Sequence, residues 1–145
     1  MNSLLRLLSF CVLAGWSIAA MAEATVSSIR VTSRLDLNSI IVSGVDVVFF
    51  YDASIVAEQP LTQFEWYSNK RDYRATHGEV IDIVNLPIPQ GFGGATLTLP
   101  ARHRSALKVL VFAEHQSSAS PSFDITGMQD VLIEIDQFGL LVSEQ

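Results

Sequence analysis

Apolar and polar residues alternate along most of this chain, in short runs separated by turn-forming residues. A period of two places successive side chains on opposite faces of an extended backbone, as in a β-strand with one buried face. Runs of this kind occupy residues 27–37, 39–52, 60–69, 79–89, 90–100, 105–115, 130–136 and 137–145. Helical spacing of apolar residues is almost absent, so the pattern predicts about seven to nine short strands.

Two of these runs are apolar on both faces, which is typical of strands at the centre of a sheet. They cover residues 45–51, where Asp46 is the only charged residue, and residues 107–112. Ser43 and Gly44 predict a break or a β-bulge just before the first of them. Residues 130–136 and 137–145 predict a hairpin-like pair that turns at Phe138 and Gly139.

The strand pattern predicts an all-β domain, an antiparallel β-sandwich of transthyretin-like or immunoglobulin-like type. Residues 53–76 leave room for one short helix. Within that stretch, however, Phe64 and Trp66 alternate with Glu65 and Tyr67, and such aromatic-rich alternation favours a strand.

The amino-terminal segment has the layout of a secretory signal peptide. A short start with one positive charge, Arg6, precedes an apolar stretch over residues 7–18, and Ala20 and Ala22 place small residues at a cleavage site. The apolar stretch is shorter than the roughly 20 residues of a membrane-spanning helix. We expect cleavage of residues 1–22, which leaves a single sandwich domain of residues 23–145 in the periplasm or outside the cell.

The only cysteine, Cys11, lies inside this predicted signal. Phe10, directly before it, is too bulky for the processing site of a bacterial lipoprotein, so no lipid anchor is expected. Without a cysteine the domain can form no disulfide, and its stability must come from packing.

The charge of the chain argues against nucleic acid as a partner. The net charge is −6, and loss of Arg6 with the signal leaves eight basic residues against fifteen acidic ones, or −7. Phosphate groups would be repelled by such a surface.

No pattern of catalytic or metal-binding residues stands out. His77, His103 and His115 fall in three separate segments without metal-ligand spacing, and no G-x-S-x-G pentapeptide occurs. The glycines of GFGG at 91–94 lack the Lys-Ser/Thr of a phosphate loop and predict a turn with positive φ. We therefore predict no catalytic residue, no metal site and no cofactor.

Two short segments, residues 69–74 and 101–104, concentrate basic side chains, and tyrosines accompany the first of them. Arg and Tyr are enriched at protein interfaces. Solvated loops are the simpler interpretation of either segment alone. A different interpretation is a stacking platform for a carbohydrate, although burial of a tryptophan in the core is commoner. The candidate partner-binding residues are Lys70, Arg71, Tyr73, Arg74, Arg102 and Arg104, and the alternative stacking residues are Trp66 and Tyr67.

Three segments resemble the TssJ family, the small outer-membrane lipoproteins of the type VI secretion system. They are VDVVFFY at 45–51, FEWY at 64–67 and LPARHRSALKVLVFA at 99–113. The resemblance implies a periplasmic, transthyretin-like sandwich that docks on the periplasmic part of an inner-membrane secretion component. Members of the family are tethered through a lipidated amino-terminal cysteine, so this chain resembles an unlipidated relative that is held by its partners.

The first functional hypothesis is an exported, non-enzymatic assembly component of a bacterial envelope machine that binds a protein partner. Recognition would use loops at one end of the sandwich or an exposed edge strand that accepts another chain. Two alternatives are a carbohydrate- or small-ligand-binding module and a fimbrial or self-assembling subunit.

Overall fold

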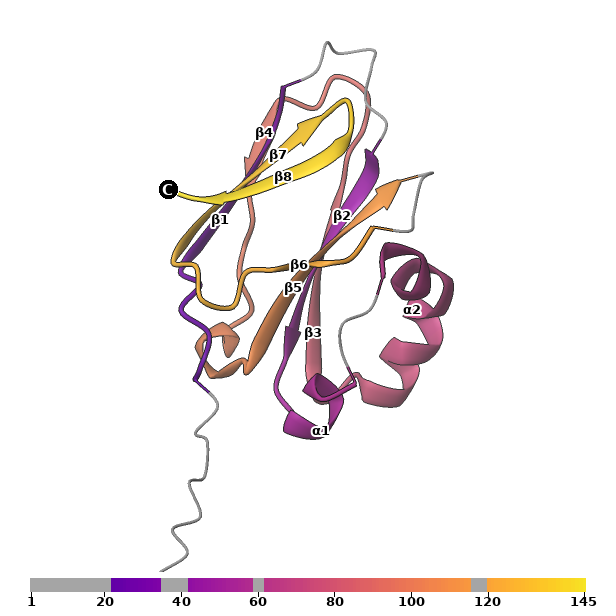
Figure 1. Cartoon of the computed structure of the whole chain (residues 1–145), viewed down its shortest axis with the longest axis vertical. Helices are drawn as coiled ribbons and strands as arrows, with labels where there is room; N and C mark the ends of the chain where they lie inside the picture. Colours follow the sequence, from indigo (N-terminus) through magenta and orange to yellow (C-terminus); the bar gives the residue numbers. More distant parts are fainter. Residues whose placement is uncertain (1–21, 35–41, 59–61, 116–119) are drawn as a thin grey trace, which may run out of the picture.

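Two four-stranded sheets form the core of this protein (Figure 1). The computed structural model describes residues 22–34, 42–58, 62–115 and 120–145, and the predicted signal peptide lies almost wholly outside them. Sheet I has the strand order β4-β1-β7-β8, and sheet II has the order β3-β2-β5-β6. The strands are β1 (Ser28–Ser33), β2 (Val42–Phe50), β3 (Ile81–Pro87), β4 (Gly94–Thr96), β5 (Lys108–His115), β6 (Phe123–Asp124), β7 (Asp130–Asp136) and β8 (Gly139–Glu144). The predicted β-sandwich is therefore confirmed.

Strand pairing follows the sequence pattern closely. β2 and β5, the two runs that are apolar on both faces, lie at the centre of sheet II as predicted. The register of β2 against β5 shifts between Val42 and Gly44, which confirms the predicted bulge. β7 and β8 form the predicted hairpin, and Gly91 adopts the predicted positive φ, 81°. One pair departs from the antiparallel expectation: β1 runs parallel to β7, with Ile29 opposite Val131.

The main core fills the space between the sheets. Alternate residues of each strand point into it, as the period of two requires. Fully buried members from sheet I are Ile29, Val31, Ile133 and Ile135, and those from sheet II are Val45, Val47, Phe49, Val109 and Val111.

The structure contradicts the strand expected around Phe64 and Trp66, because α2 (Gln63–His77) is a 15-residue helix. A capping box starts it. The Thr62 hydroxyl accepts a hydrogen bond from the Glu65 backbone N–H at 3.2 Å, and the Glu65 carboxylate accepts one from the Thr62 N–H at 2.8 Å. These bonds satisfy amides that the first turn of a helix leaves unpaired. A shorter helix, α1 (Ala53–Val56), precedes it.

α2 covers the face of sheet II that points away from sheet I, so the molecule has three layers (Figure 1). A second buried cluster lies between the helices and this face. Its members are Val48, Phe50, Ile55, Trp66, Ile81, Leu110 and Phe112. β2 and β5 are thus buried on both sides, which explains why apolar residues occupy both faces of each strand. Neither α1 nor α2 is long and apolar enough to cross a membrane, and no other helix in the described part of the chain is either.

Candidate functional site

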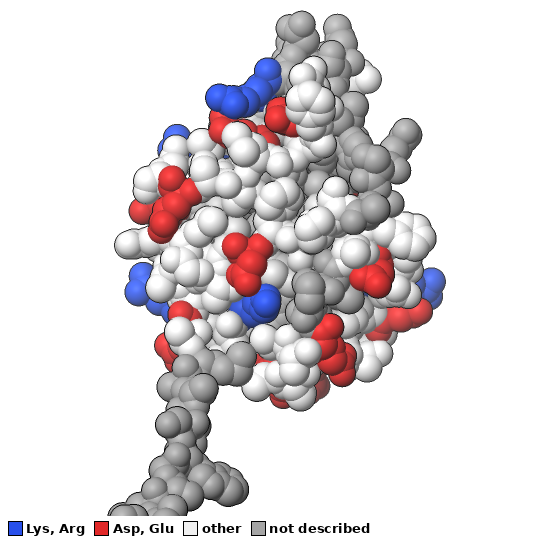
Figure 2. Space-filling view, viewed as in Figure 1, with Lys and Arg blue, Asp and Glu red and all other residues white. Residues whose placement is uncertain are grey.

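The segment predicted as a basic loop belongs to α2, and its side chains do not share one role. Lys70 turns inward and its Nζ lies 2.7 Å from the carboxylate of Asp46, which has no exposed surface. Tyr73 packs edge-on against Trp66, with ring centroids 5.8 Å apart. Arg71 and Arg74 are exposed. On the face in Figure 2, Lys and Arg side chains form small separate groups rather than one patch.

Asp46 is the centre of a polar network that holds α2 on sheet II. Its Oδ2 accepts a hydrogen bond from the indole N–H of Trp66 at 2.9 Å in addition to the ion pair with Lys70. Its Oδ1 accepts one from the side-chain amide of Asn85 at 2.7 Å. Buried charges persist when they are paired and fully hydrogen-bonded. Lys70 therefore has a structural partner and is not a free cation for docking.

The two aromatic residues proposed for ligand stacking make contacts within the protein. Trp66 is 1% exposed and stacks on Phe112, with ring centroids 4.8 Å apart. The hydroxyl of Tyr67 donates a hydrogen bond to the Phe112 carbonyl at 3.2 Å, and burial raises the pKa of Tyr67 above its ordinary value. In this structure Trp66 presents no ring face to a sugar, so the core interpretation of Trp66 agrees with its burial.

Arg102 belongs to a second cluster, at the free edge of β3. Its guanidinium makes two hydrogen bonds to the Asp82 carboxylate, at 2.9 and 3.2 Å, and lies 4.0 Å from the centroid of the Tyr51 ring. The Tyr51 hydroxyl donates to the same carboxylate at 2.8 Å. The hydrogen bonds from Arg102 lower the pKa of Asp82, while burial and the bond to Asp82 raise the pKa of Tyr51. A raised pKa makes the Tyr51 phenol a poor nucleophile or base.

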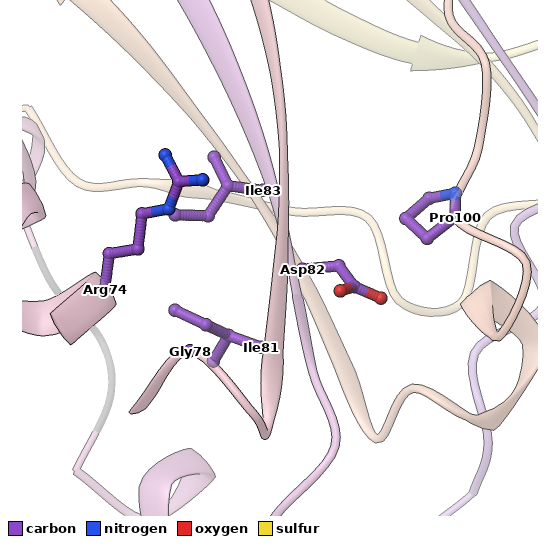
Figure 3. Close-up of a pocket in the computed structure, with 6 residues that line it drawn as sticks. All are labelled: Arg74, Gly78, Ile81, Asp82, Ile83 and Pro100. Atoms are coloured by element: carbon purple, nitrogen blue, oxygen red, sulfur yellow. The ribbon is translucent and has the colours of Figure 1, made fainter. Parts of the chain in front are cut away.

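A hollow of about 340 Å³ adjoins this cluster (Figure 3). Its lining residues are Arg74, Gly78, Ile81, Asp82, Ile83 and Pro100. In Figure 3 the side chain of Arg74 extends toward Ile83, whereas Asp82 projects on the other side of the strand, toward Pro100. The carboxylate is already held by Arg102, so the hollow combines a structural ion pair with aliphatic walls.

Replacing Arg102 by glutamine should raise the pKa of Asp82 toward its ordinary value. Asp82 has a lowered pKa in the folded protein, so its ion pair stabilises the fold above the unfolded pKa, and this stabilisation is lost as the pH falls through the folded pKa. The variant should show a smaller loss of stability on acidification. NMR titration of the Asp82 carboxyl carbon checks the shift, with Arg71→Gln on the exposed face of α2 as the matched control. An unchanged Asp82 titration in the Arg102 variant would contradict this assignment.

Arg102 also shields the edge of β3. The bonds from Tyr51 N–H to the Val80 carbonyl and from Ile88 N–H to the Ser43 carbonyl show that even-numbered residues of β3 pair with β2. Odd-numbered residues thus face outward, and Arg102 donates to two of their carbonyls, at 3.0 Å to Glu79 and 3.5 Å to Ile81. Pro87 offers no N–H at the far end. Charges and prolines of this kind prevent pairing with other chains.

At the opposite edge of the sandwich, the residues that the structure describes provide no such protection. Gln145 N–H donates to the Asp130 carbonyl at 2.8 Å, so odd-numbered residues at the end of the chain pair with β7. Leu140, Val142 and Glu144 consequently direct their backbone groups outward, and the described structure records no partner for those of Leu140 and Val142. β8 contains no Lys, Arg or Pro. The other edges, β4 with three residues and β6 with two, are short.

A hollow of about 160 Å³, with polar and apolar walls in similar measure, lies beside β8 at the edges of sheets I and II. Its lining residues are Gln63, Ala113, Ser120, Phe123, Phe138, Gly139 and Leu140. Phe138 at the hairpin turn is 81% exposed, and Leu141 on the outer face of β8 is 45% exposed. We name β8 and this hollow the open edge. It combines unpaired backbone groups with apolar surface, the two features that an added strand would bind.

No catalytic, metal-binding or basic motif of the sequence marks the open edge. Its signal was the absence of Lys, Arg and Pro in the run 139–144, together with an aromatic residue at the predicted turn. The described residues also contain no cluster of three or more His, Cys, Asp or Glu side chains that could hold a metal ion.

Comparison with known proteins adds one distant likeness. No protein-family model matches the chain, and no curated protein matches it. Among solved structures, the chain is similar to Lip of Serratia marcescens, described as a membrane-bound component of the type VI secretion system. The match covers 81% of this chain and 98% of that chain, with 14% sequence identity and a TM-score of 0.43. The description of the fold therefore rests on the strand pairing and packing of this chain itself.

Proposed function

We propose that this chain is an exported, non-enzymatic interaction component of a bacterial envelope machine, and that its partner protein binds at the open edge. The observation that carries the proposal is the outward-facing backbone of β8 beside a hollow that Phe123, Phe138 and Leu140 help to line. A strand added to β8 would form main-chain hydrogen bonds, and the hollow would receive alternate side chains. Docking would also remove the exposed side chains of Phe138 and Leu141 from water, and burial of this apolar surface would favour binding.

The two long edge strands, β3 and β8, differ in how well their outward backbone groups are shielded, and this difference supports β8 as the binding strand. β3 is the other long edge strand, and Arg102 and Pro87 occupy positions where another chain would pair. Natural sheets use such devices to avoid unwanted association. A protein that protects one long edge and leaves the other open is suited to binding one extended partner at a defined place.

The envelope location rests on the sequence. The proposed signal peptide of residues 1–22 directs residues 23–145 to the periplasm or beyond. The resemblance of segments 45–51, 64–67 and 99–113 to the TssJ family supports type VI secretion as the machine. The middle segment of that resemblance lies on α2.

The test compares two substitutions at one position of β8. Val142→Pro removes an outward N–H, whereas Val142→Ala keeps the N–H and also truncates the side chain. Envelope proteins captured on the wild type are identified, purified and measured individually for binding. The true partner should bind the wild type and the alanine variant alike, and the proline variant about tenfold or more weakly, since several main-chain bonds depend on the register.

Two results would overturn the proposal. One is a purified partner that binds the proline variant as tightly as the wild type, which would place its site elsewhere. The other is failure of every captured protein to bind in purified form. Thermal unfolding of both variants must first confirm that each is folded.

A further inference from the structure

We infer that the segment bound at the open edge is an extended strand of another protein, with large apolar residues at alternate positions and Lys or Arg near both ends. This inference rests on the proposed function and specifies the chemistry of the partner. The apolar requirement comes from the inner side of β8, and the basic requirement comes from the charges at its two ends.

The apolar requirement follows from strand alternation. Leu140 and Val142 point toward the core of the sandwich, and Leu140 also lines the hollow of the open edge. A strand added beside β8 continues the pleat of sheet I, so every second side chain would point to the same side as Leu140 and Val142. Phe123 and Phe138 line the space that these side chains would enter. Large aliphatic or aromatic residues would pack on these two rings and on Leu140, while Gln63 and Ser120 form the polar part of the lining.

The basic requirement follows from unbalanced charge. The hairpin of β7 and β8 carries Asp130, Glu134, Asp136 and Glu144, and no Lys or Arg. Only Glu134 has an ion-pair partner in the described structure, Arg34 at 3.0 Å.

The other three carboxylates accept hydrogen bonds from neutral donors, which leaves their charge uncompensated. Asp136 accepts one from the Phe138 N–H at 2.7 Å, at the turn of the hairpin. Asp130 accepts from the Ser28 hydroxyl at 2.6 Å, and Glu144 accepts from the Gln129 N–H at 2.6 Å, at the opposite end of the hairpin. A docked strand would thus meet a carboxylate near each of its ends, with the apolar Leu141 between them. Complementary charges at such positions favour encounter and register.

The same charges argue against a second copy of this chain as the occupant. Two β8 strands paired antiparallel would bring the turn of one hairpin, with Asp136, to the chain end of the other, with Glu144. Like charges brought together in this way are destabilising. A strand with Lys or Arg near its ends would instead be attracted to the carboxylates at these positions.

The test uses three short labelled peptides with blocked ends. The first, Lys-Val-Thr-Phe-Thr-Val-Lys, has the inferred pattern; the second replaces both lysines by glutamate; the third, Lys-Thr-Thr-Val-Phe-Val-Lys, has the same composition without alternation. By fluorescence anisotropy in low salt, the first should bind about tenfold or more tightly than either control. Its advantage over the glutamate peptide should shrink at about 0.5 M salt, because salt screens exposed charges.

Amide hydrogen exchange locates the bound peptide without any substitution in the protein. The N–H groups of Leu140 and Val142 face outward and should become protected on binding, whereas those of Leu141 and Ser143 already pair with β7 and should change little.

Four other results would overturn all or part of this inference, and they differ in what they leave of the proposed function. Equal binding of the basic and glutamate peptides, with protection of Val142, would overturn the charge rule and leave the proposed function standing. Binding without protection of Leu140 and Val142 would overturn both. Protection of these amides in the free protein, together with a dimer in solution, would identify a second copy as the occupant and overturn the inference. Binding by none of the peptides would overturn the inference alone, since the purified partner tests the proposed function separately.

Discussion

Replacing Asp46 by alanine should lower the free energy of unfolding by about 3 kcal/mol. The substitution removes the acceptor for the indole N–H of Trp66, the side-chain amide of Asn85 and the ammonium of Lys70. The side chain of Lys70 is 29% exposed and Asn85 is an exposed residue, so both donors can turn toward water, and most of the loss comes from the buried indole N–H of Trp66. Urea denaturation followed by far-ultraviolet circular dichroism measures the change. Asp72→Ala, at an exposed position of α2, should change stability by less than about 0.5 kcal/mol.

A double-mutant cycle separates the ion pair from the hydrogen bonds. Lys70→Met leaves the buried carboxylate without its cation and should be costly, whereas Asp46→Asn retains an acceptor oxygen of the same shape. If the network acts as a unit, the Asp46→Asn, Lys70→Met double variant should be more stable than the sum of the two single losses predicts. Strict additivity would show that Lys70 and Asp46 do not depend on each other for stability.

The two central strands of sheet II were predictable because β2 and β5 are apolar on both sides, and the structure covers both sides. The packing of sheet I against one face was expected. The packing of α2 against the other face was not expected. Asp46 lies inside an apolar run, however, and its burial requires a polar partner. The carboxylate could be buried only with donors supplied from another element.

Residues 53–76 left room for a helix, but a strand was favoured around Phe64 and Trp66, for a physical reason. The inner face of α2 follows a helical spacing through Gln63, Trp66, Lys70 and Tyr73, but two of these four side chains are polar. Gln63 accepts a hydrogen bond from the Ala113 N–H, and Lys70 pairs with Asp46, so both work inside the interface. Hydrophobic periodicity counts such residues as solvent-facing and loses the signal. The capping box of Thr62 and Glu65 was the local signal that could have found the helix.

The candidate site depends on the order of strands, which short-range patterns do not contain. Arg102 was singled out for its charge, yet its position against the carbonyls of Glu79 and Ile81 follows from β3 being an edge strand. Val142 has an ordinary strand sequence around it, and only the absence of a neighbour beyond β8 in the described sheet makes its N–H available. The sequence analysis expected an edge strand as one way of binding a partner. The identity of that strand became known only from the strand order of the two sheets.

Replacing Trp66 by alanine should lower the free energy of unfolding by about 3–5 kcal/mol, because the indole is the largest fully buried side chain among the described residues. It stacks on Phe112 of β5 and contacts Tyr73 in the next turns of α2, so its loss leaves a cavity between helix and sheet. Trp66→Phe should cost roughly 1–3 kcal/mol, since it keeps an aromatic ring and loses the hydrogen bond to Asp46. Urea denaturation followed by circular dichroism measures both variants, and Phe64→Ala, at a side chain that is 62% exposed, is the matched control on the same helix.

The Trp66 series also separates the stability of α2 from ligand binding. A ring that served as a platform for a sugar would be exposed, and its truncation would change binding with little loss of stability. A ring that holds a helix on a sheet has the opposite signature, a large loss of stability. An alanine variant as stable as the wild type would contradict the packing of α2 on sheet II. A large loss in Trp66→Ala beside a small one in Phe64→Ala would instead establish that α2 is held from its inner face, through Trp66 and the carboxylate of Asp46.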